Sequence, residues 1–195
     1  SGSEARILNT TSRCPLGEVL AGAEEVLLLR VPLPADCGTD GLTPGALLLA
    51  EGHSGHKVVR WAVDAKVLGS RSTSLVSPQF KLDLGAAGSA DFKMVLAPPP
   101  ATSFQKACGM GQIHVKCQST LNTKVTFAIS VSGALGGSTP EVHDHDFGRC
   151  AVWKKEHEPI DLKAITAMAT PQRGLPKKVV VVRLEIIDAL CNAAL

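Results

Sequence analysis

The chain has 195 residues, of which 45% are hydrophobic, with five Phe, two Trp and no Tyr. This apolar fraction can supply a core, which excludes a mainly disordered chain, and no apolar run approaches the roughly 18 residues of a membrane-spanning helix. The formal net charge of +2 and the scarcity of aromatic rings argue against nucleic acid or an anionic membrane as the main partner. Any membrane association is therefore expected to be indirect.

Short runs in which apolar and polar residues alternate dominate the sequence, separated by Gly, Pro, Ser and Asp. This pattern predicts strands with one face in a core and one in water. In chain order, the predicted strands cover residues 26–31, 46–50, 58–67, 80–84, 92–96, 113–117, 125–131 and 180–186. A short helix is predicted over residues 159–168, where Leu162, Ile165 and Met168 recur at helical spacing. The expected fold class is all-β, an antiparallel β-sandwich with an N-terminal β extension.

The six cysteines lie at positions 14, 37, 108, 117, 150 and 191, and none forms a C-x-x-C pair with another. This spacing argues against a zinc ribbon or a thioredoxin-type site. Cys117 alternates with Ile113 and Val115, so we expect a buried thiol that packs as a small hydrophobe. Cys14 and Cys37 are the best disulfide candidates, and the sequence leaves open whether that bond forms.

The run His143-Asp144-His145-Asp146 has the residue types of a metal site. Alternation in an extended chain can place imidazole and carboxylate ligands on one side, so His143, His145 and Asp146 are candidate ligands. The favoured interpretation is a polar loop whose end buries Phe147, because no spacing here sets a complete ligand shell. No G-x-S-x-G elbow or nucleotide-binding loop in its strand-to-helix context is present. We therefore expect no catalytic residues and no cofactor.

The order of these features resembles the MATH domain, the TRAF-homology β-sandwich. The matching segments are residues 58–67, 77–80 (Ser-Pro-Gln-Phe), 91–98, 111–117, 124–131, 145–147 (His-Asp-Phe), Trp153, 160–162 and 181–186. The same sequence motifs are also similar to those of uncharacterised sandwich proteins from dinoflagellate algae. The resemblance implies a sandwich over residues 57–188, preceded by residues 1–56, whose strands pack on or extend it, and followed by a tail, residues 189–195.

MATH domains bind short peptide segments on a sheet surface without catalysis, and the resemblance implies the same here. Their grooves are lined by aromatic residues, often Tyr, whereas this chain has no Tyr, keeps Trp153 at a comparable place and has Lys155 two residues further on. The resemblance therefore points to a contact through loops and a sheet face. The expected contact residues are Trp153, His114, Lys116 and the docking loop Pro98, Pro99, Pro100 to Phe104.

The leading hypothesis is a non-catalytic protein-protein interaction module that acts as a subunit of a larger assembly. The algal resemblance implies a particular form of it, a peripheral accessory subunit of an organellar membrane complex such as a photosystem. The expected location is intracellular, with a plastid or another organelle as candidates. Two alternatives stay open: a metal-binding protein or small metal-dependent enzyme that uses His143 and His145, and a peptide-binding adaptor that uses a MATH groove around Trp153.

Overall fold

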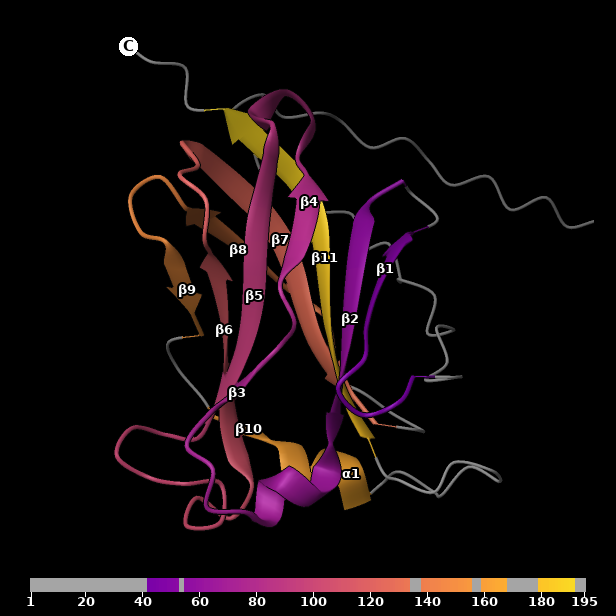
Figure 1. The fold of residues 1–195 in the computed structure, drawn as a ribbon, viewed down its shortest axis with the longest axis vertical. Helices are drawn as coiled ribbons and strands as arrows, with labels where there is room; N and C mark the ends of the chain where they lie inside the picture. The colour runs from indigo at the N-terminus through magenta and orange to yellow at the C-terminus, as the bar shows by residue number, and fades with distance from the viewer. Residues whose placement is uncertain (1–41, 53–54, 134–137, 156–158, 168–178, 192–195) are drawn as a thin grey trace, which may run out of the picture. The chain divides into compact units, whose positions relative to one another are not determined.

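The computed structural model describes residues 42–52, 55–133, 138–155, 159–167 and 179–191. The chain divides into two units, Ser1–Ala35 and Asp36–Leu195, and every described residue belongs to the second. Within it, two antiparallel sheets face each other across one core (Figure 1). The expected all-β sandwich is thereby confirmed. None of the helices in the described ranges is long and apolar enough to cross a membrane.

The first sheet has five strands in the order β1-β2-β11-β7-β8. Its strands are β1 (Leu47–Glu51), β2 (Lys57–Asp64), β7 (Thr123–Ser132), β8 (Glu141–Asp146) and β11 (Val179–Cys191). Strand β11 lies between β2 and β7, so that Val182 is opposite Trp61 on one side and Val131 on the other. The strand latest in the sequence is thus the central strand of this sheet.

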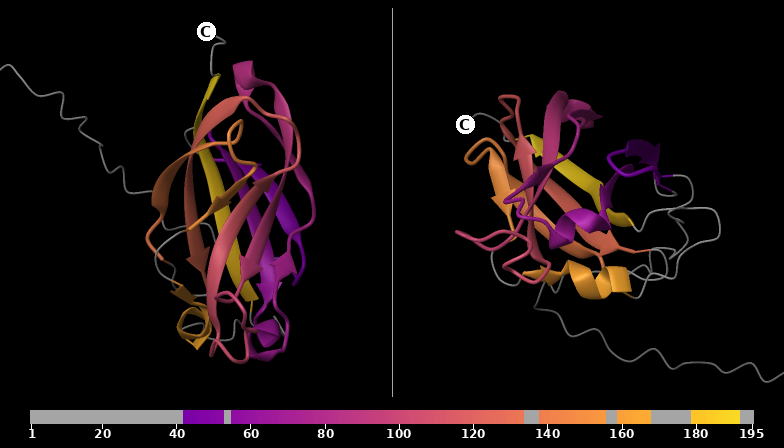
Figure 2. Two further views of the ribbon diagram at one scale, coloured as in Figure 1. Left: turned by 90° about the vertical axis from the view of Figure 1, so that its left-hand side faces the viewer. Right: turned by 60° about the horizontal axis from the view of Figure 1, so that its bottom comes forward.

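The second sheet follows the order β10-β6-β5-β3, with β4 also paired to β5 and β9 also paired to β6. Its strands are β3 (Leu75–Val76), β4 (Phe80–Asp83), β5 (Ser89–Ala97), β6 (Met110–Cys117), β9 (Val152–Lys154) and β10 (Ile160–Asp161). In Figure 1, β4 and β5 lie in front of β7 and β11, and Figure 2 shows the molecule from two further directions.

The core forms where the inward faces of the two sheets meet. In β5 the buried residues are Ala90, Phe92, Met94 and Leu96, which alternate with more exposed ones, and β7 and β11 contribute Val125 and Leu184 from the facing layer. Burying each of the larger side chains contributes about 1.5–3 kcal/mol relative to leaving it in water. The alternation that predicted the strands is therefore also what divides core from surface.

One end of the sandwich is closed by two short helices, η1 (Ala65–Gly69) and α1 (Leu162–Ala167), near the bottom of Figure 1. Leu162 is fully buried and lies against Gly111 of β6. A Cβ added at Gly111 would lie only 2.5 Å from Leu162 Cδ1, so this close packing requires a glycine. The start of β6 is thereby held against α1.

The outer face of the first sheet carries a charged cluster in its middle. Arg183 of β11 is directly opposite Arg60 of β2, and two residues further along β11 the buried Glu185 accepts a hydrogen bond from Arg183 Nη2 at 2.8 Å. The other carboxylate oxygen, Oε1, lies 3.2 Å from His56 Nδ1. Since like charges opposite each other repel, Glu185 offsets the cost of bringing the two guanidinium groups together.

The structure differs from the sequence-based expectations in several elements. Residues 143–146 were expected in a polar loop but belong to strand β8, and β9 was not predicted. The strand expected to reach residue 67 ends at Asp64, whose carboxylate accepts from the Lys66 N–H at 2.9 Å and begins η1. The expected helix begins at Leu162 rather than at residue 159, and its expected last residue, 168, lies outside the described residues. The strand predicted over residues 26–31 lies outside the described residues.

Candidate interaction site

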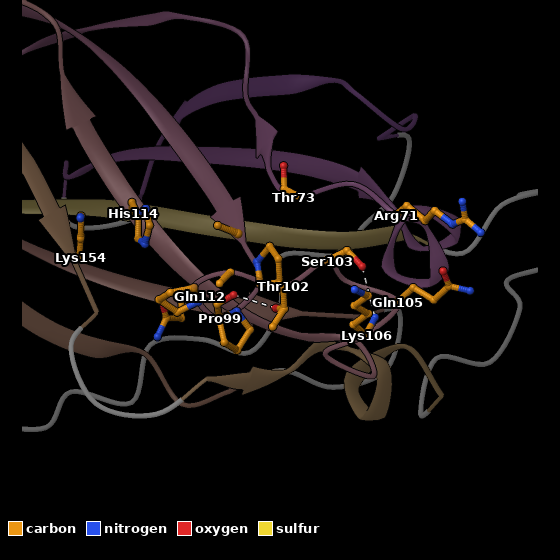
Figure 3. A pocket seen from close by; sticks show the side chains of 14 residues that line it. Arg71, Thr73, Pro99, Thr102, Ser103, Gln105, Lys106, Gln112, His114 and Lys154 are labelled. Carbon is orange, nitrogen blue, oxygen red and sulfur yellow. Dashed lines mark hydrogen bonds between the residues drawn. The ribbon is translucent and has the colours of Figure 1, made fainter.

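A hollow of about 790 Å³ lies beside the start of β6. Its floor and walls come from the segment after β5, from the loop after η1, and from β6 and β9 (Figure 3). The described residues that line it are Arg71, Thr73, Ala97, Pro98, Pro99, Pro100, Ala101, Thr102, Ser103, Gln105, Lys106, Gln112, His114 and Lys154. The expected docking loop therefore borders this hollow, together with His114 of the neighbouring strand β6.

The loop that borders the hollow is tied down along its length. Phe104 is fully buried and its N–H donates to the Ser72 carbonyl at 3.1 Å, while the Gln105 N–H donates to the Ser70 carbonyl at 2.9 Å. Near its start, Thr102 Oγ1 donates to the Pro99 carbonyl at 2.8 Å, a bond drawn in Figure 3. Three consecutive prolines restrict the backbone further. Because the loop is already ordered, binding of a partner would not have to pay the entropy cost of ordering it.

The side chains around the hollow are basic at both ends. His114 and Lys154 lie at one end, Arg71 and Lys106 at the other, with Gln112 between them (Figure 3). None of the described lining residues is acidic. Burial, reinforced by the positive charge of Lys154, lowers the pKa of His114 below its ordinary value. The hollow therefore disfavours additional positive charge and favours an anionic occupant.

The structure brings some of the predicted contact residues together and removes others from the surface. Pro98, Pro99, Pro100 and His114 all line the hollow. Lys116 is exposed on β6, two residues beyond His114. The accessible part of the expected contact surface is therefore one continuous region at this end of the second sheet.

Trp153 and Phe104 were expected to contribute to the contact surface, and the structure corrects this expectation. Trp153 is 8% exposed and Phe104 is 0% exposed. The Trp153 ring packs edge-on against Phe127 with 5.1 Å between centroids, and 4.6 Å from the His143 ring. All seven aromatic rings of Phe and Trp in the chain are buried. A groove lined by aromatic side chains, as in the MATH family, has no exposed ring to use here.

Sequence reasoning missed Arg71, Lys106 and Lys154 as neighbours of His114. They come from three separate segments, and each alone is an ordinary exposed cation. One sequence signal could have found Lys154: it follows Trp153, so in a strand it must face away from a buried tryptophan. The register that places it opposite His114 could not be read from one sequence.

The His-Asp cluster is organised as a strand whose histidines pack on aromatic rings. His143 contacts Trp153 and Phe127, and His145 stacks edge-on against Phe147 at 4.6 Å. His145 Nε2 lies 2.8 Å from the Cys150 carbonyl oxygen. Asp144 points to the other face, where it pairs with Lys124 at 2.9 Å. Phe147 is buried, as the favoured interpretation required.

This arrangement gives the metal alternative no support. The described residues contain no group of three or more His, Cys, Asp or Glu side chains placed to hold a metal ion. Asp146 accepts hydrogen bonds from the Gly148 and Arg149 N–H groups and pairs with Arg149. The alternation of His and Asp thus divides the cluster between a packed face and a solvated face.

The burial of His143 makes the fold sensitive to acid. Its Nε2 has no hydrogen-bond partner and lies 3.7 Å from Glu141 Oε2, and burial lowers the pKa of the ring. Because the unfolded chain then binds the proton more tightly, stability is complete above the ordinary histidine pKa of about 6.5 and falls as the pH drops below it. A His143→Phe variant is expected to lose less stability than the native protein between about pH 7.5 and about pH 5.5.

Urea unfolding at several pH values measures this difference. The pKa of His114 is also lowered, so His114 adds to the loss of stability in acid. A His114→Gln variant serves as the control and should remove only the part of the pH dependence that His114 causes. Parallel pH profiles for the native protein and His143→Phe would show that His143 does not carry the effect.

Three cysteines of the described residues, Cys108, Cys117 and Cys150, are free thiols. Cys117 is buried, as expected, and burial raises its pKa, which keeps it in the unreactive protonated form. Cys108 and Cys150 are exposed. The candidate pair Cys14 and Cys37 lies outside the described residues.

Comparison with known proteins adds no relative to this description. No protein-family model matches the chain, and a search of curated proteins found no match.

Proposed function

We propose that this protein is a non-catalytic interaction module that binds another protein through the basic hollow and the adjoining face of the second sheet. The observation that carries the proposal is the hollow itself, which is bordered by a loop anchored at Phe104 and opens beside His114. A pre-ordered loop, a cavity that can accept side chains and a charged sheet face are the parts of a protein-binding surface.

The same surface is poorly suited to catalysis. It offers His114 and three cations but no carboxylate, Ser–His pair or thiolate among its described lining residues. Thr102 and Ser103 are engaged within the loop, Thr102 with the Pro99 carbonyl and Ser103 with the Lys106 N–H. A binding role therefore fits the lining better than nucleophilic or acid-base chemistry.

The MATH-like assignment and the accessory-subunit form of the proposal rest on the sequence resemblance. A fixed place in a larger organellar complex agrees with a pre-ordered contact loop, because a permanent neighbour gains from a rigid surface. A MATH groove centred on Trp153 is not proposed, since that ring packs against Phe127 in the core.

Site-specific cross-linking tests the proposal. A photo-reactive amino acid placed at Gln105, which is exposed at the hollow, is expected to form a cross-link to one protein in extract of the producing cells. The matched control carries the same amino acid at Leu190, which is 56% exposed on β11 at the opposite end of the sandwich. A protein captured from Gln105 and not from Leu190 supports a binding role for this surface. Equal capture at both positions, or none, contradicts it.

A further inference from the structure

The cations of the hollow continue onto the outer face of the second sheet. There, two cross-strand pairs place positive or titratable groups directly opposite each other: Lys93 of β5 faces Lys116 of β6, and His114 of β6 faces Lys154 of β9. Like charges at opposed positions, as in the Lys93–Lys116 pair, destabilise a sheet by up to about 1 kcal/mol, and Lys154 opposes protonation of the His114 ring. The fold by itself gains nothing from this arrangement.

These cations are not neutralised within the described part of the chain. Arg71, Lys93, Lys106, Lys116 and Lys154 make no ion pair with a described carboxylate, whereas cations elsewhere, such as Lys124 and Lys155, do. We call these five cations and His114 the basic strip.

Among the described residues, the carboxylates on the same face lie away from the hollow or are already engaged. Asp91 is two residues from Lys93 on β5 and directly opposite Lys81, and Asp83 of β4 lies further still from Ala97 and the hollow. Asp161 of β10 accepts a hydrogen bond from the Ala164 N–H at 2.8 Å and so begins α1. The cations that line the hollow therefore have no described carboxylate beside them and keep their positive charge available for a ligand.

From this charge pattern we infer that the occupant of the hollow is an extended acidic segment of another protein, with carboxylates that pair with His114 and Lys154 at one end and with Arg71 and Lys106 at the other. The inference rests on the proposed function and names the partner's chemistry. Between the charged ends, Gln112 and the prolines offer polar and apolar contacts to uncharged residues of the segment. A volume of about 790 Å³ accommodates several side chains.

Single-stranded nucleic acid is the anion class that this surface fits least. Its binding sites combine cations with exposed aromatic rings on which bases stack. Every Phe and Trp ring of this chain is buried, and the chain has no Tyr. A polypeptide needs no such rings, because carboxylate pairing and backbone contacts suffice.

Fluorescence anisotropy with a labelled peptide in which Glu alternates with Ala tests the inference. The native protein is expected to bind this peptide and to bind its Gln-for-Glu counterpart at least about ten-fold more weakly. Lys154→Glu and Arg71→Glu should each weaken binding of the Glu peptide by about ten-fold or more. The matched control is Lys81→Glu, which makes the same charge change on the same sheet face but at the far end, and should change the affinity less than about two-fold.

Three results would overturn the inference: equal binding of the Glu and Gln peptides, an equal loss in Lys81→Glu, or displacement of the Glu peptide by inorganic phosphate, phosphatidylserine vesicles or a single-stranded oligonucleotide at lower concentration than by unlabelled peptide. Unfolding curves of each variant establish that the fold is intact. Failure of this test is distinct from failure of the proposed function, because a protein cross-linked from Gln105 would still identify a partner with different chemistry.

Discussion

Replacement of Trp153 by alanine is expected to lower the free energy of unfolding by about 3–5 kcal/mol, because it removes a large buried side chain and leaves a cavity. The indole packs edge-on against Phe127, 5.1 Å between centroids, and lies beside His143, so its loss also removes aromatic contacts between the two sheets. Urea unfolding followed by circular dichroism gives the difference in free energy.

The neighbouring residue on the same strand provides the control for this prediction. Lys154 is exposed, and Lys154→Ala is expected to change the unfolding free energy by less than about 0.5 kcal/mol. Trp153→Phe should retain part of the stability that Trp153→Ala loses, because the phenyl ring fills part of the cavity. A Trp153→Ala protein as stable as the native one would show that the indole is a surface group, as the MATH resemblance had implied.

Removal of the buried carboxylate in the first sheet is the second large effect. Glu185→Ala is expected to cost roughly 3 kcal/mol, because it removes the carboxylate that pairs with Arg183 and leaves that guanidinium opposite Arg60 without its acidic partner. Glu185 is 3% exposed, so water cannot take the place of the lost carboxylate as it would at the surface. The measurement is again equilibrium unfolding, at a pH near neutrality.

Two variants separate this explanation from a general loss of packing. Asp144→Ala breaks an exposed ion pair, with Lys124, and should cost less than about 1 kcal/mol. The double variant Arg183→Leu with Glu185→Leu removes the buried pair as a whole and should be far less damaging than Glu185→Ala. If Glu185→Ala and Asp144→Ala cost the same, the pairing of Glu185 with Arg183 does not stabilise this part of the sheet.

Much of this sandwich could be predicted from the sequence because its long strands have clean alternation. Phe92, Met94 and Leu96 are buried at every second position of β5, and the same holds for Ile113, Val115 and Cys117 of β6. In a strand with one buried face, every second side chain points into the core, so the positions of the apolar residues identify the face that packs there.

Strand β8 could not be predicted in this way. Its inward positions are occupied by His143 and His145, which are polar by composition but pack on Trp153 and Phe147. An imidazole can lie against an aromatic ring while its nitrogens find other partners, so alternation of His with Asp hides an amphipathic strand. Both the metal-site interpretation and the loop interpretation of residues 143–146 arose because His143 and His145 were counted as polar residues rather than as side chains that pack on the core.

The candidate site was only partly visible in the sequence for a related reason. The proline loop and His114 stood out because of their composition and their place in a strand pattern. The basic strip depends on which strands are neighbours, since Lys116 meets Lys93 and Lys154 meets His114 only through the pairing of β6 with β5 and β9. Net charge cannot reveal it, because a total of +2 is compatible with any distribution over the surface.

The central place of β11 has a consequence for how the chain folds. Val179 pairs with Asp64 and Cys191 with Thr123, so β2 and β7 cannot be joined into one sheet until the segment Val179–Cys191 has been synthesised. Closing loops of this length is entropically costly and slows folding. Until that segment is made, the edges of β2 and β7 that will pair with β11 are open to pairing with other chains, so formation of the first sheet is a late step among the described strands.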